Sequence, residues 1–192
     1  MPKSVLFDKE KTIKKVTELF WEKGYNGTSM QDLVDITGLN RSSIYNTFGD
    51  KFSLFTQALH HYKDSQTHFL TSLQDKTKSP KQVIHLLFEG VWSELNPVNN
   101  KGCFLSNCTT ELANANQDVH KFLEINHHTM VDLFSDLISK AQEAGEIPAD
   151  KNPKELANFL FSSLQGLRVT SMIETDKKAI KAIADQVLSA LN

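Results

Sequence analysis

The chain has 192 residues, of which 40% are hydrophobic and 23% are charged, and its formal net charge is -2 at pH 7. This composition is that of a globular protein and excludes an intrinsically disordered chain. The small negative charge also excludes a protein that coats nucleic acid over its whole surface, so any contact with DNA must come from a local patch.

No apolar run approaches the roughly 20 residues that a membrane-spanning helix needs. The N-terminus also lacks the apolar core of a signal peptide. We therefore expect a cytoplasmic protein with no membrane partner. In that compartment Cys103 and Cys108 are expected to be free thiols rather than a disulfide.

The first helix is predicted to begin after Asp8, a residue type that caps helices, and to run to Lys23, where Gly24 ends it. Its apolar residues recur on one face: Ile13, Val16 and Phe20. A basic patch precedes and accompanies them: Lys3, Lys9, Lys11, Lys14 and Lys15. Taken alone, these lysines fit a solvated helix face as well as a set of phosphate contacts.

Residues 29–48 are predicted to form a helix-turn-helix. Thr28 is the expected N-cap of its first helix, and Gln31 is expected to complete a capping box. One buried stripe follows at helical spacing: Met30, Leu33, Val34 and Thr37. Gly38 is expected to end this helix, because glycine tolerates the left-handed backbone of a tight turn.

The second helix of the pair is predicted to begin after Asn40, and its only apolar pair is Ile44 and Phe48. Its other residues form a face of hydrogen-bond donors and acceptors: Arg41, Ser42, Ser43, Tyr45, Asn46 and Thr47. A helix that enters the major groove of DNA needs such a face to contact base edges and phosphates.

These residues resemble, in order and spacing, the N-terminal signature of the TetR family of bacterial transcriptional regulators. The resemblance covers the first third of the chain and rests on Phe20, Gly24, Tyr25, Thr28, Ser29, Met30, Asp32, Leu33, Thr37, Gly38, Leu39, Ser43, Ile44, Tyr45, Phe48, Lys51 and Leu54. It implies DNA contacts by Thr28, Ser29, Arg41, Ser42, Ser43, Tyr45, Asn46, Thr47 and Lys51.

Particular roles follow from the chemistry of these side chains. The Arg41 guanidinium can bind guanine or phosphate through two donors, although an isolated arginine would be read as an exposed charge. The resemblance implies that Tyr45, by default a core aromatic residue, sends its hydroxyl to a phosphate. It also implies a backbone contact for Lys51, and the Thr28 hydroxyl is a further phosphate donor. The N-terminal lysines, which lie just before this unit, are then expected to contact phosphates.

Asp50 is expected to cap a long fourth helix that starts at Lys51 and extends about 35 Å. We therefore predict a DNA-binding domain over 1–50 and a larger domain over 51–192. Pro80 is expected to open the next helix, 96–102 to form a loop, and 103–113 to form a short helix that resembles the sixth helix of one TetR subset.

Two longer helices are expected near 119–145 and from Pro153, and a last helix carries Ile180, Ile183, Val187 and Leu191. No strand-like alternation or internal repeat appears, so the predicted fold is all-α, with about nine helices. The resemblance implies that the last two helices, about 153–191, form a homodimer. Two recognition helices about 34 Å apart would then read a palindromic DNA operator.

The resemblance also implies a small-molecule effector bound in the larger domain. The candidate wall residues are Trp92, Phe104, Asn107, Cys108, Met130, Phe134 and Gln165. Core packing is the stronger interpretation for the apolar members, because pockets and cores use the same residue types. Asn107 and Gln165 are more informative, since a buried amide needs partners. Arg168 raises the same question with charge, and could instead pair across the dimer.

Cys103 and Cys108 have two interpretations. Buried, unreactive cysteine is the first. The second is a thiol sensor at Cys103, which follows Gly102 at a predicted helix start where the dipole would lower the pKa of the thiol. The pairs His60-His61 and His127-His128 lack the spacing of a metal site and are expected to be surface histidines, so we expect no metal and no cofactor.

The sequence therefore predicts a ligand-responsive, dimeric repressor of transcription, with an apolar or aromatic effector that carries one or two polar groups. A regulator that senses thiol modification is the alternative. An all-α enzyme or metalloprotein fits less well, because no nucleophile motif, phosphate loop or metal-ligand set is present.

Overall fold

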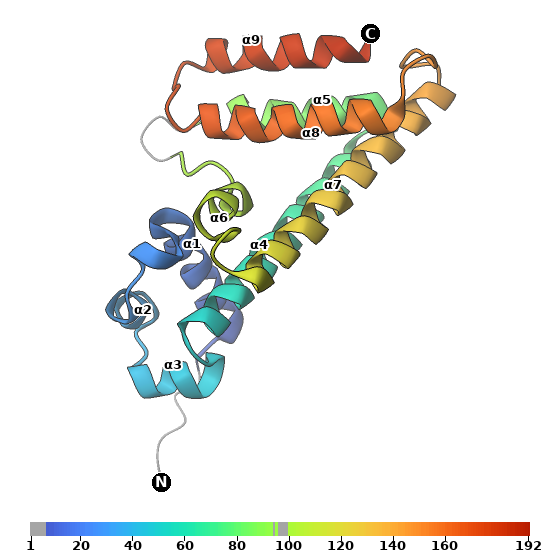
Figure 1. The fold of residues 1–192 in the computed structure, drawn as a ribbon. Coiled ribbons are helices and arrows are strands. Elements are labelled where there is room, and N and C mark those ends of the chain that lie inside the picture. Colours follow the sequence, from blue (N-terminus) through green and yellow to red (C-terminus); the bar gives the residue numbers. More distant parts are fainter. Residues whose placement is uncertain (1–6, 94, 96–99) are drawn as a thin grey trace.

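The computed structural model describes residues 7–93, 95 and 100–192. This part of the chain forms nine α-helices and one short 3-10 helix with no strand, so the all-α prediction is confirmed (Figure 1). Lys3 and the predicted loop residues 96–99 lie outside the described residues. The helices are α1 (Lys9–Gly27), α2 (Met30–Thr37), α3 (Arg41–Phe48), α4 (Lys51–Lys76), α5 (Pro80–Ser93), α6 (Phe104–Leu112), α7 (Gln117–Glu143), α8 (Pro153–Thr170), α9 (Lys177–Leu188) and η1 (Ser189–Leu191).

Side-chain caps fix where the first helices begin. Asp8 accepts a hydrogen bond from Lys11 N at 3.0 Å, Asn40 from Ser43 N at 2.8 Å, and Asp50 from Ser53 N at 2.7 Å. The predicted N-caps of α1, α3 and α4 are therefore confirmed. Each cap satisfies an amide that the first turn of a helix leaves without a partner.

The predicted end of the first helix needs a correction. Gly24 has φ 72° and ψ 174°, which interrupts the helix as expected, but the chain resumes a helical course beyond this kink and α1 ends only at Gly27. The extra turn places Tyr25 beside Phe20 and Phe55, with ring centroids 6.3 and 5.0 Å apart. Aromatic packing therefore stabilises the segment after the break.

Helices α1, α2 and α3 form a head at one end of the molecule, and α5, α8 and α9 gather at the other end (Figure 1). Helix α4 leaves the head and reaches α5, and its 26 residues span about 39 Å. None of the helices in the described ranges combines the length and apolarity needed to cross a bilayer.

The molecule has two hydrophobic cores, one at each end. The first contains the head residues but continues through the start of α4 into α6 and the start of α7. Phe20, Phe55 and Phe104 form an aromatic series across it, with successive ring centroids 5.1 and 6.0 Å apart. The second core joins the end of α4 with α5, α7, α8 and α9. The head therefore shares its core with α6, although α6 lies far along the chain.

Candidate nucleic-acid interface and ligand cavities

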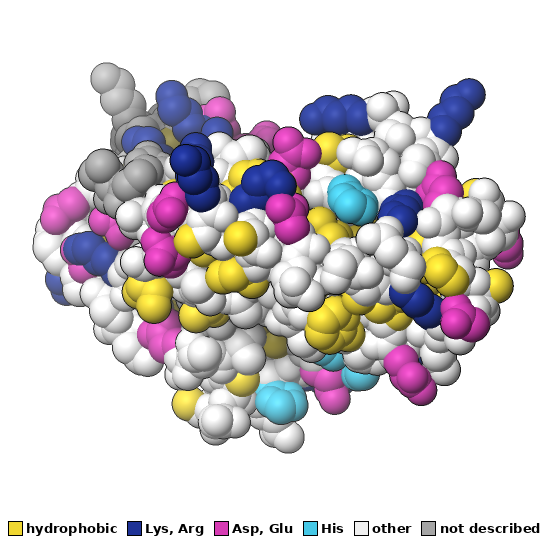
Figure 2. Space-filling model, turned by 90° about the horizontal axis from the view of Figure 1, so that it is seen from above, with side chains coloured by type: hydrophobic (Ala, Val, Ile, Leu, Met, Phe, Trp, Pro, Cys, Tyr) yellow, Lys and Arg dark blue, Asp and Glu magenta, His cyan; other side chains and the backbone are white. Residues whose placement is uncertain are grey.

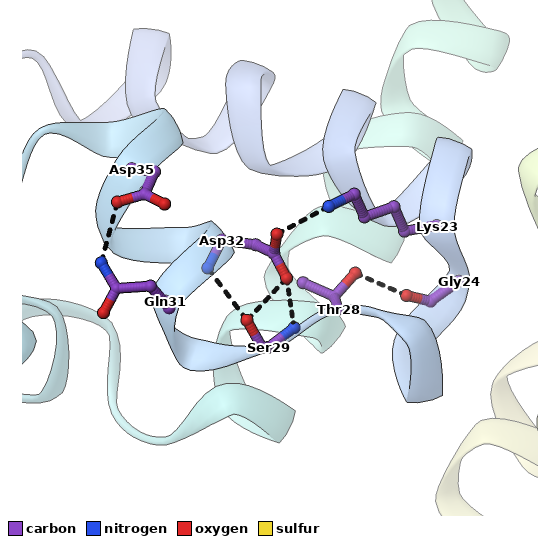
Figure 3. Close-up of polar contacts among 7 residues, drawn as sticks. All are labelled: Lys23, Gly24, Thr28, Ser29, Gln31, Asp32 and Asp35. Carbon is purple, nitrogen blue, oxygen red and sulfur yellow. Dashed lines mark hydrogen bonds and ion pairs between the residues drawn. The ribbon is translucent and has the colours of Figure 1, made fainter.

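Helix α2 is capped by Ser29 and not by Thr28, which corrects the sequence prediction (Figure 3). The Ser29 hydroxyl accepts a hydrogen bond from Asp32 N at 3.1 Å, and the Asp32 carboxylate accepts one from Ser29 N at 2.8 Å. Gln31, the predicted box partner, instead donates to Asp35 at 2.8 Å. The Asp32 carboxylate, rather than the Gln31 amide, completes the capping box because it also pairs with Lys23 at 2.6 Å.

Thr28 is buried between the end of α1 and the start of α2. Its side chain is only 1% exposed, and its hydroxyl donates to Gly24 O at 2.6 Å (Figure 3). Because Gly24 departs from helical geometry, its carbonyl is available to this hydroxyl. The Thr28 hydroxyl thus donates its hydrogen bond to the backbone at the Gly24 kink, inside the head.

Helix α3 presents the predicted polar face. Ile44 and Phe48 are buried in the head core, as predicted, while Tyr45 is 50% exposed. The other residues of this face are exposed or half-buried: Arg41, Ser42, Ser43, Asn46 and Thr47. Among the described residues, no carboxylate forms an ion pair with Arg41. The side chains of α3 are therefore free to contact another molecule.

Basic side chains flank this face. The Lys51 ammonium lies 4.4 Å from the ring centre of Tyr25, and Lys9 lies 5.7 Å from that of Phe48. These cation–π contacts orient the ammonium groups and leave their remaining donors free. Ser29 is exposed at the start of α2, and three further lysines of α1 are exposed: Lys11, Lys14 and Lys15. Positive charge therefore lies beside α3 at Lys9 and Lys51, and further lysines are exposed elsewhere on the head.

The seven predicted wall residues of the effector site do not lie together. Met130 and Gln165 line a small cavity of about 40 Å³. Phe104 and Cys108 belong to the first core and Phe134 to the second, while Trp92 packs against the second core. The Asn107 amide donates to Lys101 O at 2.9 Å, so its partner is protein backbone.

A larger cavity of about 500 Å³ lies where the head meets the rest of the molecule. We call it the junction cavity, and its walls come mainly from α1, α4, α5, α8 and the segment 100–102. Its polar and aromatic members are Glu18, Trp21, Tyr62, Gln66, Phe69, Asn100, Lys101, Arg168 and Ser171. Sequence reasoning missed most of these residues. The available signal was Trp21, a large aromatic residue outside the apolar stripe of the first helix.

One further cavity adjoins the junction cavity, and another adjoins that one in turn. The 40 Å³ cavity shares Tyr62, Gln66 and Arg168 with it. A cavity of about 680 Å³ between α6, α7 and α8 shares Phe161 and Gln165 with the small one. Arg168 therefore lies between the junction cavity and the interior of the larger domain.

The segment 100–102 ties the junction cavity to its neighbours. Trp21 Nε1 donates to Lys101 O at 3.1 Å, and the Lys101 ammonium lies 2.9 Å from the Glu18 carboxylate. On the other side, Asn100 donates through its amide to Ser171 O at 2.6 Å, just after α8. A movement of this segment would therefore alter its contacts both with α1 and with the end of α8.

Helix α6 makes a second link to the head. The Glu111 carboxylate accepts hydrogen bonds from Tyr25 N at 3.1 Å and Asn26 N at 2.7 Å. The approach depends on Gly24, because a Cβ atom there would lie 2.7 Å from Glu111 Oε2. Charged acceptors form strong hydrogen bonds with backbone amides, so Glu111 fixes the last part of α1 against α6.

The two cysteines are free and differ in their surroundings. Burial by itself would raise the pKa of the Cys103 thiol, but the charge of Arg168, the Ser106 amide and the Tyr62 hydroxyl bring this pKa below its ordinary value. The Tyr62 hydroxyl lies 3.7 Å from Cys103 Sγ. Burial raises the pKa of the Cys108 thiol. Cys103, the N-cap residue of α6, is thus the more acidic thiol.

The histidine pairs occupy different settings. The His60 ring packs against Phe122 with centroids 4.9 Å apart, and the rings of His127 and His128 lie 5.5 Å apart. Within the ranges that the structure describes, no group of three or more His, Cys, Asp or Glu residues is placed to hold a metal ion.

Two family models match the chain. "Bacterial regulatory proteins, tetR family" matches residues 13–58, and "Tetracyclin repressor-like, C-terminal domain" matches residues 86–187, which is more than half of the chain. The chain is 28% identical over 188 residues to the uncharacterized HTH-type transcriptional regulator YezE of Bacillus subtilis, and the match covers 97% of each protein. It is also 28% identical to the HTH-type transcriptional repressor DhaR of Mycobacterium sp. (strain GP1), over 93% of this chain and 89% of that protein.

Solved structures show the same architecture. A cysteine mutant of the TetR family transcriptional regulator CifR, in complex with 26-base-pair double-strand operator DNA, has a TM-score of 0.83 and 25% identity, with both chains fully covered. A TetR family regulator from Cytophaga hutchinsonii has a TM-score of 0.85 and 20% identity, with 96% of each chain covered. The helical arrangement described above is therefore that of known regulators.

Proposed function

The chain belongs to the tetR family of bacterial regulatory proteins, and from this premise we propose that it is a repressor that binds palindromic operator DNA as a homodimer and releases it when a small molecule binds. The family is one of transcriptional regulators. A protein of this kind would act in the cytoplasm, where bacterial DNA lies. We keep residue 50 as the proposed boundary between the DNA-binding and effector-binding domains.

The single observation that carries the proposal is the polar face of α3. This helix buries Ile44 and Phe48 and presents its other side chains to solvent, with Lys51 and the lysines of α1 beside them. In this proposal Arg41 and Asn46 contact base edges, while Tyr45 and Lys51 contact phosphates. The remaining predicted contacts are Ser29, Ser42, Ser43 and Thr47. Thr28 is left out because its hydroxyl is buried.

Exposed apolar residues on the last two helices support the proposed dimer. Phe159 on α8 is 49% exposed and Ile183 on α9 is 43% exposed, whereas most of their apolar neighbours are buried. The face of the molecule over α9 shows hydrophobic side chains between charged ones (Figure 2). Burial of such residues against a second copy would stabilise a four-helix bundle.

Effector binding would act on the head through the contacts at the junction. A molecule in the junction cavity would touch Trp21 and Lys101, and so disturb the links from segment 100–102 to α1 and to the end of α8. A few ångströms of head movement would prevent both recognition helices from fitting their half-sites at once. Repression would then end without any change in the polar face of α3 itself.

The test is binding of purified protein to DNA that flanks its own gene, at several stated salt concentrations. Arg41→Ala and Tyr45→Phe are expected to weaken binding to one short palindrome, by about tenfold for the loss of a good base contact. Lys140→Ala, which removes an exposed charge far from the head, is the control and should leave binding unchanged. Equal affinity for random DNA at every salt concentration would refute the proposal.

A thiol-sensing regulator remains a second candidate, because Cys103 combines a lowered pKa with the Tyr62 contact. Cys103→Ser and Cys108→Ser separate the two candidates. A thiol sensor would lose its response to an oxidant or electrophile when Cys103 is replaced, whereas a regulator released by reversible binding would keep its response to the effector.

A further inference from the structure

Among the described residues, the walls of the junction cavity carry a positive charge that no negative charge matches. Three charged side chains line it: Glu18, Lys101 and Arg168. Glu18 and Lys101 pair with each other at 2.9 Å. Among the described residues, no carboxylate lies within 4.0 Å of the Arg168 guanidinium. The described wall residues therefore carry one net positive charge, at Arg168.

The hydrogen bonds of Arg168 are also incomplete. A guanidinium has five N–H donors. The one hydrogen bond that its side chain makes with the described residues runs from Nη1 to Gln165 Oε1 at 3.5 Å, the outer limit for such a bond. Arg168 is half-buried in the last turn of α8, where the helix dipole favours a cation but supplies no carboxylate. A half-buried guanidinium with free donors is a good partner for a planar anion.

The remaining walls suit an apolar or aromatic body. Trp21, Tyr62, Phe69, Leu87, Val91 and Leu95 surround the cavity with rings and aliphatic side chains. Its volume of about 500 Å³ is in the range of ordinary small-molecule sites. Gln66 lines both this cavity and the 40 Å³ one, and its amide forms no hydrogen bond with the described residues, so it offers a second polar contact.

We propose that the effector of this regulator is a small organic carboxylate with an aromatic or apolar body, and that its carboxylate binds Arg168 in the junction cavity. This inference rests on the proposed function and specifies the chemical class of its ligand. A cationic effector would meet the Arg168 charge without a compensating carboxylate. A neutral effector would leave that charge unpaired in a cavity from which water had been displaced.

The position of Arg168 gives the ligand a route to the head. The body of a carboxylate held there extends past Tyr62 towards Trp21, whose rings already meet with centroids 5.1 Å apart. Trp21 belongs to α1 and donates to Lys101 O. Displacement of the Trp21 ring would therefore act on both α1 and the segment 100–102, with no need for the signal to travel the length of α4.

The test compares arylcarboxylates, from benzoate to naphthoate, with their primary amides, which have nearly the same shape but no charge. Binding to the full-length protein without DNA is measured by calorimetry and by quenching of tryptophan fluorescence. We expect at least one carboxylate to bind about tenfold or more tightly than its amide. Arg168→Gln is expected to abolish this preference, while Lys140→Gln, which removes an equal charge elsewhere, should preserve it. Cys103→Ser should also preserve it.

Several outcomes would overturn the inference. These are the absence of carboxylate binding to the wild-type protein, equal affinity for acid and amide, a preference that survives Arg168→Gln, and a preference that disappears in Cys103→Ser. A change in dimer dissociation by Arg168→Gln with no change in ligand preference would assign Arg168 to the dimer instead. Should Arg168→Gln not fold, as judged by circular dichroism, Arg168→Lys is used, which keeps the charge and is expected to retain a weakened preference. Operator binding is measured separately, so failure of this inference leaves the proposed repressor function intact.

Discussion

Replacing Gly24 by alanine should destabilise the protein strongly. Gly24 has φ 72° and ψ 174°, a backbone region that only glycine adopts readily. An added Cβ would also lie 2.7 Å from Glu111 Oε2 and 3.1 Å from Glu111 Cδ. The substitution therefore combines backbone strain with the loss of the link between α6 and α1.

The expected magnitude follows from these two effects. Backbone strain of this kind costs about 1–3 kcal/mol. Moving Glu111 away from Tyr25 N and Asn26 N removes two hydrogen bonds to a charged acceptor and adds about 1–3 kcal/mol. We expect Gly24→Ala to lower the free energy of unfolding by about 2–6 kcal/mol, which is a large part of the stability of a typical domain.

Two other glycines provide matched controls. Gly38 has φ 71° but open space around its Cβ position, so Gly38→Ala should cost only the strain of the left-handed conformation, about 1 kcal/mol. Gly27 is not in the left-handed region and its Cβ would make an ordinary contact at 3.8 Å, so Gly27→Ala should be neutral or slightly stabilising. Comparison of the three variants separates the cost of backbone strain from the cost of the collision with Glu111.

The assay is urea-induced unfolding at fixed protein concentration, because dimerisation makes apparent stability depend on concentration. The effect of Gly24→Ala is also measured in a Glu111→Ala background, where the collision is absent and the cost should fall to that of strain alone. If Gly24→Ala costs no more than Gly38→Ala, or costs the same with and without Glu111, the proposed collision is refuted.

Three other predictions concern charge, association and thiol chemistry. Asp32→Asn should lower the melting temperature at neutral pH, because hydrogen bonds from Lys23 and Ser29 hold the pKa of Asp32 below its ordinary value. That stabilisation decreases once the pH falls below about 4 and is lost only as the pH passes through the lowered pKa, so the difference between variant and wild type should begin to shrink below about pH 4, and a constant difference would contradict this. Phe159→Glu combined with Ile183→Glu should convert the dimer to monomer in analytical ultracentrifugation and weaken operator binding without unfolding the chain, whereas an unchanged mass would place the dimer interface elsewhere. Cys103 should be alkylated by iodoacetamide at lower pH than Cys108, as followed by peptide mass spectrometry, since their pKa values are shifted in opposite directions; equal pH profiles would argue against the acidity assigned to Cys103.

Local patterns were enough to predict much of the head and most helix ends. Asp8, Asn40 and Asp50 cap helices because their carboxyl or amide oxygens reach amides only three residues away. Pro80 and Pro153 open helices because proline lacks the amide that a first turn cannot use. Ile44 and Phe48 are buried as the helical period requires, which leaves the polar face of α3 outside. These features depend on residues within a few positions of one another.

The start of α2 lies at the limit of such reasoning. Both a Thr28–Gln31 box and a Ser29–Asp32 box fit the local pattern, and only the second forms. Lys23 and the kink at Gly24 decided between them, by pairing with the Asp32 carboxylate and by taking the Thr28 hydroxyl. Both groups belong to α1, so the choice was made by packing between helices.

The positions and walls of the cavities depend entirely on the tertiary structure. The seven predicted wall residues scatter between two cores and one small cavity, because apolar residues at helical spacing fill cores and cavities alike. The junction cavity instead brings Trp21 beside Arg168, and Glu111 reaches Tyr25 from 86 positions away. By itself, the sequence determined the helices and the polar face of α3, since those follow from short-range hydrogen bonds and periodicity. Only the tertiary structure decided where the Arg168 charge and an unfilled space would meet, because the positions of both depend on how distant helices pack.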